Sequence, residues 1–273
     1  MTYEVVLTMI TKEIIDNYIE KIPPAPDALR QTIFFLNNGE LTKAANSAQS
    51  DPSLSSYLKS IVNKPIYGFK NEVSEISQIF GILGATGSQT TVYNYMISLL
   101  SPDKWLLFKL NANSFGSLQD TLSFKWKKIL QHLEIDDKDV ENSIALLPAS
   151  IIVAEALFCE KIEDVTLIRT AKDIDYNTIL VRLTGSDLFE ICEQISNKWE
   201  MPKKIAHIVQ AASGVKPSAD EQINTLGKWM HLLIFFELSQ PVYVEAGLND
   251  FVEFQIDYVQ DIYDDFASLM EIT

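Results

Sequence analysis

The sequence is poor in the residues that form disulfides or bind metals. Among 273 residues there are two cysteines, Cys159 and Cys192, and three histidines. Two cysteines do not make a disulfide framework, and each lies in an apolar stretch of sequence, which is typical of a small buried hydrophobe. His132, His207 and His231 fall on separate predicted helices, where we expect surface or helix-flank positions. A Cys/His zinc site needs four converging ligands, and this pattern does not indicate one.

Long apolar runs are also missing. No stretch of eighteen apolar residues occurs, which predicts that no helix spans a membrane. The first residues lack the positive region of a secretory signal, and there is no internal repeat or low-complexity linker. Apolar residues make up 47% and charged residues 22%, the balance of a globular domain. We therefore expect a cytoplasmic protein.

Positive charge is scarce, above all toward the C-terminus. The chain has 22 Lys and Arg residues against 37 Asp and Glu residues, a net charge of −15. No basic residue follows Lys228, whereas nine acidic residues do. Nucleic acids and anionic membranes are bound through basic surfaces. The sequence therefore predicts that the chain binds neither.

What the sequence does contain is a succession of amphipathic segments. Apolar residues recur at three- and four-residue steps, which predicts helices. They are expected at residues 2–22, 27–37, 41–48, 52–62, 74–84, 88–100, 117–133, 136–147, 149–158, 187–199, 202–212, 220–238 and 249–270. For residues 104–115 we expect a brief helix and a loop, and for residues 160–184 helices or coil. The fold class indicated is all-α.

The stretch from residue 51 to 84 carries the most specific pattern, a helical hairpin. Asp51 can accept hydrogen bonds from the first N–H groups of a helix, and Pro52 fits its first position. The helix ends near residue 63, a tight aromatic turn follows, and a second helix ends at Gly84. The residues of this pattern are Asp51, Pro52, Leu54, Asn63, Tyr67, Gly68, Leu83 and Gly84.

This pattern resembles the HDOD domain, a bacterial all-helical relative of the HD metal-dependent phosphohydrolases. Pro23 and Pro26 upstream, and Trp126, Trp199 and Pro202 downstream, are similar to other signatures of that family. The resemblance implies an HD-like bundle in which an N-terminal lobe packs on a degenerate HD-like lobe. We expect an N-terminal helix at 1–22, the N-terminal lobe at 23–116, the HD-like lobe at 117–240, and a C-terminal acidic amphipathic helix at 241–273.

The same resemblance implies that the metal site of active relatives is missing. The positions similar to the family's histidine and aspartate ligands are Pro148, Ala149, Leu188, Ala211 and Ala212. Near Trp126, Lys128 stands where an active relative has a histidine. None of these side chains suits a catalytic metal, whose role is to lower the pKa of a bound water. We therefore expect no metal, no cofactor and no catalytic residues, and a protein that is not an enzyme.

The last predicted helix allows two interpretations. Its broad apolar side includes Phe251, Phe254, Tyr258 and Tyr263, opposite a row of acidic residues. The helix can pack against the core, as most amphipathic helices do. Alternatively, part of this aromatic and acidic surface can dock a partner or a second copy of the chain, because tyrosine and phenylalanine are common interface anchors.

By resemblance, HDOD proteins act in bacterial signal transduction. We expect a non-catalytic regulatory protein that works through contacts with signalling proteins or through self-association. Two alternatives stay open. One is a divergent metal-dependent phosphohydrolase with ligands drawn from Asp, Glu and the three histidines. The other is a sensor that binds a nucleotide or metabolite without chemistry.

Overall fold

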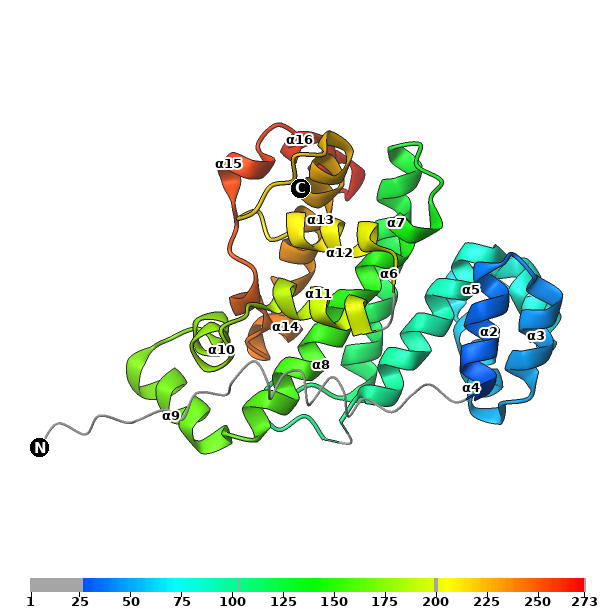
Figure 1. The fold of residues 1–273 in the computed structure, drawn as a ribbon, viewed down its shortest axis with the longest axis horizontal. Coiled ribbons are helices and arrows are strands. Elements are labelled where there is room, and N and C mark those ends of the chain that lie inside the picture. Colours follow the sequence, from blue (N-terminus) through cyan, green and yellow to red (C-terminus); the bar gives the residue numbers. More distant parts are fainter. Residues whose placement is uncertain (1–26, 103, 199–200, 273) are drawn as a thin grey trace, which may run out of the picture. The chain divides into compact units, whose positions relative to one another are not determined.

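The computed structural model describes residues 27–102, 104–198 and 201–272, and every regular element in those ranges is a helix (Figure 1). There is no β-strand in them, which confirms the all-α prediction. The elements are α2 (Asp27–Asn37), α3 (Leu41–Gln49), α4 (Pro52–Val62), η1 (Pro65–Tyr67), α5 (Ile76–Leu100), α6 (Ala112–His132), α7 (Lys138–Asn142), η2 (Ser143–Ala145), α8 (Leu146–Cys159), α9 (Ile162–Lys172), α10 (Tyr176–Thr184), α11 (Leu188–Lys198), α12 (Lys203–Ala211), α13 (Glu221–Leu238), α14 (Pro241–Glu245), η3 (Leu248–Phe251), α15 (Ile256–Val259) and α16 (Tyr263–Leu269).

The chain divides into two compact units. Among the described residues, the smaller unit runs from Asp27 to Leu100, and the larger unit comprises those from Ser101 onward. The sequence had placed the end of the first lobe at residue 116. The boundary lies earlier because the loop after α5 is held by the larger unit: the backbone N–H groups of Leu106, Leu107 and Phe108 donate to the carboxylate of Glu155 in α8, at 2.6, 3.0 and 3.1 Å.

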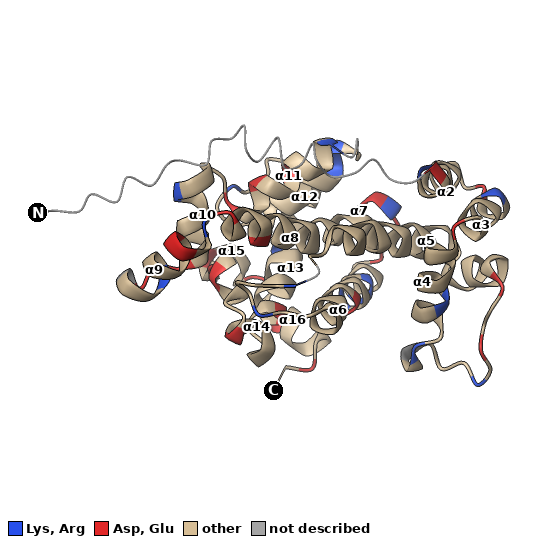
Figure 2. Ribbon diagram, turned by 90° about the horizontal axis from the view of Figure 1, so that it is seen from below, with Lys and Arg blue, Asp and Glu red and all other residues tan. Residues whose placement is uncertain are grey.

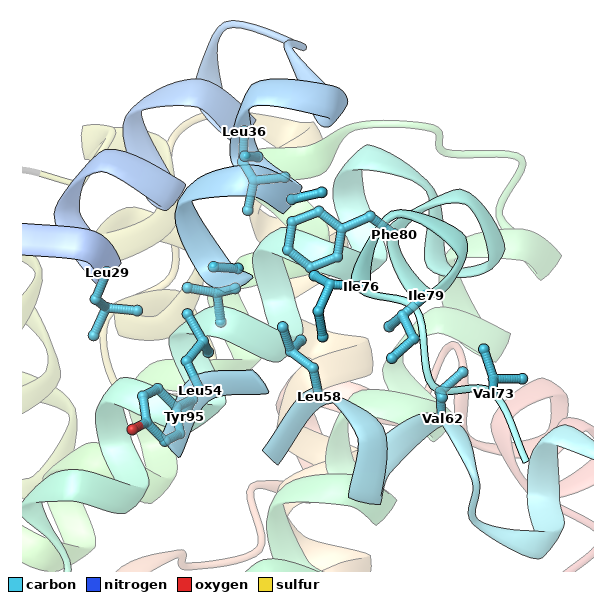
Figure 3. Close-up of a cluster of buried hydrophobic side chains, with 14 residues drawn as sticks. Leu29, Leu36, Leu54, Leu58, Val62, Val73, Ile76, Ile79, Phe80 and Tyr95 are labelled. Carbon is cyan, nitrogen blue, oxygen red and sulfur yellow. The ribbon is translucent and has the colours of Figure 1, made fainter. Parts of the chain in front are cut away.

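The smaller unit is built on one apolar cluster between α2, α3, α4 and α5 (Figure 3). Leu29 of α2, Leu54 and Leu58 of α4, and Phe80 of α5 are all buried in it. Burial of such side chains stabilises each by about 1.5–3 kcal/mol relative to exposure. The amphipathic pattern therefore predicted this core correctly.

The predicted hairpin is present in the smaller unit, with its polar residues fixing the backbone. The Asp51 carboxylate accepts hydrogen bonds from the N–H groups of Ser53 and Leu54, at 2.9 and 3.1 Å, so it caps α4. Pro52 is the first residue of that helix. Gly68 ends η1 with φ +66°, a left-handed conformation that favours glycine.

Asn63 closes the loop between the two helices of the hairpin. Its amide oxygen accepts from the N–H of Val73 at 2.8 Å, and its amide nitrogen donates to the carbonyl of Val73 at 2.9 Å. The same nitrogen also donates to the Lys59 carbonyl at 2.9 Å. These bonds join the two ends of the loop 64–72, much as a pair of strand residues would be joined.

The two helices expected at 74–84 and 88–100 form α5, which is interrupted at Gly84. This glycine has φ +70° and ψ 179°, a backbone conformation that residues with a Cβ rarely adopt. The segment on each side is helical. Gly84 therefore makes a kink in α5, and helix continues on both sides of this single residue.

The larger unit is organised around α8, almost all of whose residues are buried. α8 packs against α11, α11 against α12, and α12 against α13. The stretch Lys138–Cys159 is long and apolar enough to cross a membrane, but 89% of its apolar window is buried inside the protein. That burial is the environment of a core helix.

Of the two stretches that are hard to assign from sequence, 160–184 is largely helical, whereas 104–111 is irregular. Residues 160–184 form α9 and α10, as one of the expected outcomes. By contrast, α6 begins at Ala112, not at residue 117. Asn111 and Ser114 form a reciprocal capping box there, so an Asn- and Ser-rich stretch that indicated a loop is the start of a helix.

The prediction of one C-terminal helix at 249–270 is wrong. This stretch is broken into η3, α15 and α16, with Val252 extended between them. Its aromatic residues pack on different partners: Phe251 against Phe108 at 5.6 Å between ring centroids, Phe254 against Phe235 at 4.7 Å, and Phe266 against Trp229 at 6.0 Å. A single straight helix could not place these rings on separate parts of the unit.

Candidate functional site

The positions similar to the metal ligands of active relatives lie on α8, α11 and α12 of the larger unit, where α8 packs against α11 and α11 packs against α12. Pro148 and Ala149 are in α8, Leu188 begins α11, and Ala211 and Ala212 end α12. All five residues are buried. At the start of α11, Asp187 and Glu190 form a reciprocal capping box, with bonds of 2.8 and 3.1 Å, which fixes the backbone beside Leu188.

Close packing of α12 and α13 leaves no room at Ala211. Gly227 of α13 faces this residue: a Cβ added to Gly227 would lie 2.6 Å from the Ala211 Cβ and 2.7 Å from the Tyr258 hydroxyl. Real atoms of this kind do not approach so closely, and protein cores are packed at the density of organic crystals. A side chain longer than alanine at position 211 would therefore meet the backbone of α13.

His231 of α13 is a buried histidine whose two ring nitrogens are both engaged. Nδ1 lies 2.8 Å from the carbonyl oxygen of Ala212, and Nε2 lies 3.2 Å from the backbone nitrogen of Gln255. Because a carbonyl only accepts and an N–H only donates, the ring is neutral, with its proton on Nδ1. Burial lowers the pKa of His231, which favours the same state. No lone pair is left for a metal.

The other two histidines lie as predicted, on the surface. His132 of α6 contacts the Asp265 carboxylate at 3.0 Å, and His207 of α12 is exposed. The expectation of a surface or helix-flank position is wrong for His231 alone, because the aromatic C-terminal segment covers it: its ring stacks on Phe254 at 6.4 Å between centroids.

The neighbourhood of Trp126 is also structural. The indole nitrogen of this buried residue donates to the carbonyl of Val140 at 2.8 Å, which joins α6 to α7. Lys128 directs its ammonium group to the carbonyl of Leu269 at 2.8 Å, at the C-terminal end of α16. A cation suits this position because the last carbonyls of a helix carry partial negative charge.

Neither cysteine is set up as a nucleophile or a thiolate ligand. Burial, with the nearby Glu155 charge, raises the pKa of Cys159 to about 12, and burial raises the pKa of Cys192 to about 12. Reactive cysteines have a lowered pKa, so both thiols stay protonated at neutral pH. Cys192 is buried as expected, whereas Cys159 is only half-buried.

In the part of the chain that the structure describes, no group of three or more His, Cys, Asp or Glu side chains is arranged to hold a metal ion. The five residues that the sequence suggested as counterparts of metal ligands are part of the core. Pro23, Pro26 and Trp199 lie outside the described residues, and Pro202 is the residue immediately before α12.

The proposed interaction residues at the C-terminus divide into two kinds. Phe251 is buried at 2% exposure, so it is a core residue, which corrects the prediction for this position. Tyr258 is half-buried and donates to the carbonyl of Asn224 at 3.2 Å. Phe254 is half-buried, whereas Tyr263 is exposed. Phe254, Tyr258 and Tyr263 therefore keep some accessible surface, but the Tyr258 hydroxyl is already hydrogen-bonded.

Sequence reasoning missed Glu155, which holds the loop 105–108 against α8. Its side chain is buried at 1% exposure and accepts three backbone hydrogen bonds. A single acidic residue inside the apolar run 149–158 was the available signal. A buried carboxylate needs such partners because leaving it unpaired costs several kcal/mol.

Comparison with known proteins places these features in a family. The HDOD domain family model matches residues 22–214. A crystal structure of an HDOD domain protein of unknown function from Geobacter sulfurreducens is similar in fold, with a TM-score of 0.59 and 14% sequence identity over 95% of this chain and 96% of that one. No curated protein matches the chain.

Proposed function

The chain belongs to the HDOD domain family, and from that premise we propose that it is a non-catalytic regulatory protein of bacterial signal transduction, acting by binding other proteins. The observation that carries the proposal is the contact between Ala211 and Gly227. Two helices are closely packed at a position that resembles a metal-ligand position of active relatives, which supports the proposal.

The chemistry of the region supports this reading. A hydrolytic metal needs nitrogen or oxygen ligands and an open position for the water that it activates. Ala149, Leu188 and Ala211 are themselves apolar and buried, and His231 already uses both nitrogens. This packing favours action through the protein surface over hydrolysis at a bound metal.

The first test is for metal and hydrolysis. The purified full chain is analysed for bound transition metals, and then assayed on bis(p-nitrophenyl) phosphate and on a cyclic dinucleotide with added Mn²⁺ or Fe²⁺. We expect substoichiometric metal and no turnover above the buffer. The double variant His132→Ala/His207→Ala is the control for ions held by surface histidines. Stoichiometric metal together with hydrolysis would overturn the proposal.

The second test concerns what the protein binds. The tagged full chain is used for affinity capture from the native cell extract, and in parallel for thermal-shift measurements with nucleotides. We expect a reproducible protein partner at a stoichiometric level. A nucleotide that raises the melting temperature, with no protein partner, would instead identify a sensor, because binding to the folded state alone stabilises it.

A further inference from the structure

Aromatic side chains reach the surface where α13 meets the C-terminal segment. Phe235 of α13 and Phe254 lie with ring centroids 4.7 Å apart, and Tyr263 of α16 approaches Phe254 edge-on at 6.3 Å. Ile256 follows two residues after Phe254 and is 60% exposed. We call Phe235, Phe254, Ile256 and Tyr263 the aromatic face. All four belong to the larger unit.

This face combines accessible apolar atoms with fixed geometry. Tyr263 is 44% exposed, and Phe235 and Phe254 are half-buried. Behind them, the ring of His231 stacks on Phe254, and the ring nitrogen of His231 holds the backbone of Gln255. Aromatic side chains held in this way lose little conformational entropy when a partner covers them, which is why they are frequent interface anchors.

The rim of the aromatic face is acidic. Glu253, Asp257 and Asp264 are exposed, and acidic positions recur on α15 and α16 (Figure 2). Other carboxylates of this segment are paired: Asp261 with Lys228 at 2.6 Å, and Asp265 with His132 at 3.0 Å. Among the described residues, no Lys, Arg or His forms an ion pair with the three rim carboxylates. The sequence beyond Lys228 contains no basic residue to do so.

We propose that the aromatic face binds a basic amphipathic segment of a partner protein. The apolar side of that segment would cover Phe254, Ile256 and Tyr263, and its Lys or Arg side chains would pair with the acidic rim. The inference rests on the proposed function and names the chemistry of the partner. A second copy of the chain fits less well, because a symmetric contact would bring the same acidic rims together.

The probe is an amphipathic peptide of Leu and Lys, about 18 residues long with one Trp, of the kind that binds apolar grooves as a helix. Binding to the full chain is measured by fluorescence anisotropy at low and at physiological salt. A peptide of the same composition in scrambled order, and one with Glu in place of Lys, are the peptide controls. We expect binding of the first peptide only, weakened by salt.

Two variants of the aromatic face and its rim, each with a matched control variant elsewhere on the larger unit, test where the peptide binds. Ile256→Ser/Tyr263→Ser should weaken binding about tenfold or more, because interface anchors dominate affinity. Leu167→Ser/Val181→Ser is the matched control, since these residues of α9 and α10 are 56% and 41% exposed. Its affinity should stay within about twofold of the wild type.

The second pair separates local charge from net charge. Glu253→Gln/Asp257→Asn/Asp264→Asn removes three negative charges at the rim, and Glu160→Gln/Glu163→Gln/Asp164→Asn removes three elsewhere. We expect the rim variant to lose most of the salt-dependent affinity and the control to keep it. Equal weakening by both variants, or equal binding of the scrambled peptide, would show a non-specific attraction to an acidic protein and overturn the inference.

Sedimentation velocity completes the experiment. If Ile256→Ser/Tyr263→Ser converts a dimer to a monomer, the occupant of the face is a second copy, and the basic partner is wrong. If the chain holds no metal, shows no hydrolysis and does not bind the peptide at the aromatic face, this inference is overturned but the proposed function is not. A metal-dependent hydrolase would end the proposed function, whatever the peptide does.

Discussion

The two units of this protein differ in charge and in what their family-motif residues do. Residues 23–100 contain five basic and five acidic residues, whereas residues 101–273 contain 15 basic and 28 acidic residues. Almost the whole net charge of −15 therefore lies in the larger unit. Charge of one sign favours solubility and selects partners of the opposite sign, so the larger unit is the one equipped to choose a partner electrostatically.

In the smaller unit the motif residues shape the backbone. Asp51 caps a helix, Asn63 closes a loop, and Gly84 supplies a conformation with positive φ. In the larger unit the corresponding motif positions, Ala149 and Ala211 among them, are apolar and buried. The comparison teaches that the motif residues of the smaller unit satisfy backbone atoms, whereas Ala149 and Ala211 of the larger unit contribute packing.

The largest expected effect is the loss of stability when a charge is introduced at buried Ala149 of α8. Ala149→Asp would bury an unpaired carboxylate in α8, where Ala149 is 0% exposed. An uncompensated buried charge costs about 4 kcal/mol. Urea unfolding should show this loss, or a protein that fails to fold. Ala112→Asp, at the exposed start of α6, is the control and should change stability by less than about 0.5 kcal/mol. A small effect at position 149 would mean that the region is open to water.

The second largest effect is expected at the close contact between Ala211 of α12 and Gly227 of α13. Gly227→Ala places a methyl group 2.6 Å from the Ala211 Cβ, and overpacking of this kind costs about 2–3 kcal/mol. Gly116→Ala in α6 has no atom within 4 Å of the added Cβ, so it should stabilise the helix by roughly 0.5 kcal/mol. Thermal unfolding of both variants measures the difference. Equal behaviour would show that α12 and α13 separate easily.

In the smaller unit, the corresponding test removes a polar group. Asn63→Ala deletes the amide that bonds both backbone groups of Val73, at a cost of about 2 kcal/mol. The loop 64–72 should then be cut faster by protease, because exposed, unpinned loops are preferred sites. Asn38→Ala, whose amide bonds one exposed carbonyl, is the control and should leave the cutting rate unchanged. If both variants are cut alike, Asn63 does not close the loop.

The smallest effect concerns pH. The pKa of His231 is lowered by burial from its ordinary value of 6.5. Below that pH the unfolded chain takes up a proton that the folded chain resists. The stabilisation is therefore complete above about pH 6.5 and is lost progressively as the pH falls below that value. His231→Asn should remove this part of the pH dependence of urea unfolding, whereas exposed His207→Asn should retain it. If the difference in unfolding free energy between wild type and His231→Asn did not change with pH, the lowered pKa of His231 would be contradicted.

Much of the fold could be predicted from local chemistry. The caps at Asp51, Asp137 and Asp220 each accept backbone hydrogen bonds at the start of a helix, as their residue types indicate. The errors came where tertiary contacts override local pattern. The stretch 249–270 has the period of a helix, yet it breaks because Phe251, Phe254 and Phe266 find separate partners.

The candidate site was predictable in one respect and not in another. The apolar residue types at positions 148, 149, 188, 211 and 212 agree with their burial in the structure, while the loss of metal ligands stays a prediction. Nothing in the sequence indicated that Gly227 would face Ala211, or that His231 would be buried with both nitrogens engaged. Such contacts join residues far apart in the chain, and periodicity reports only on near neighbours.

The sequence by itself determined the all-helical class, the starts of most helices and the excess of negative charge, because each depends on residue type and short spacing. Only the tertiary structure decided which aromatic rings are core and which reach the surface, and which polar groups are satisfied. Those outcomes depend on close packing between segments distant in the sequence, where a distance of a few tenths of an ångström separates contact from collision.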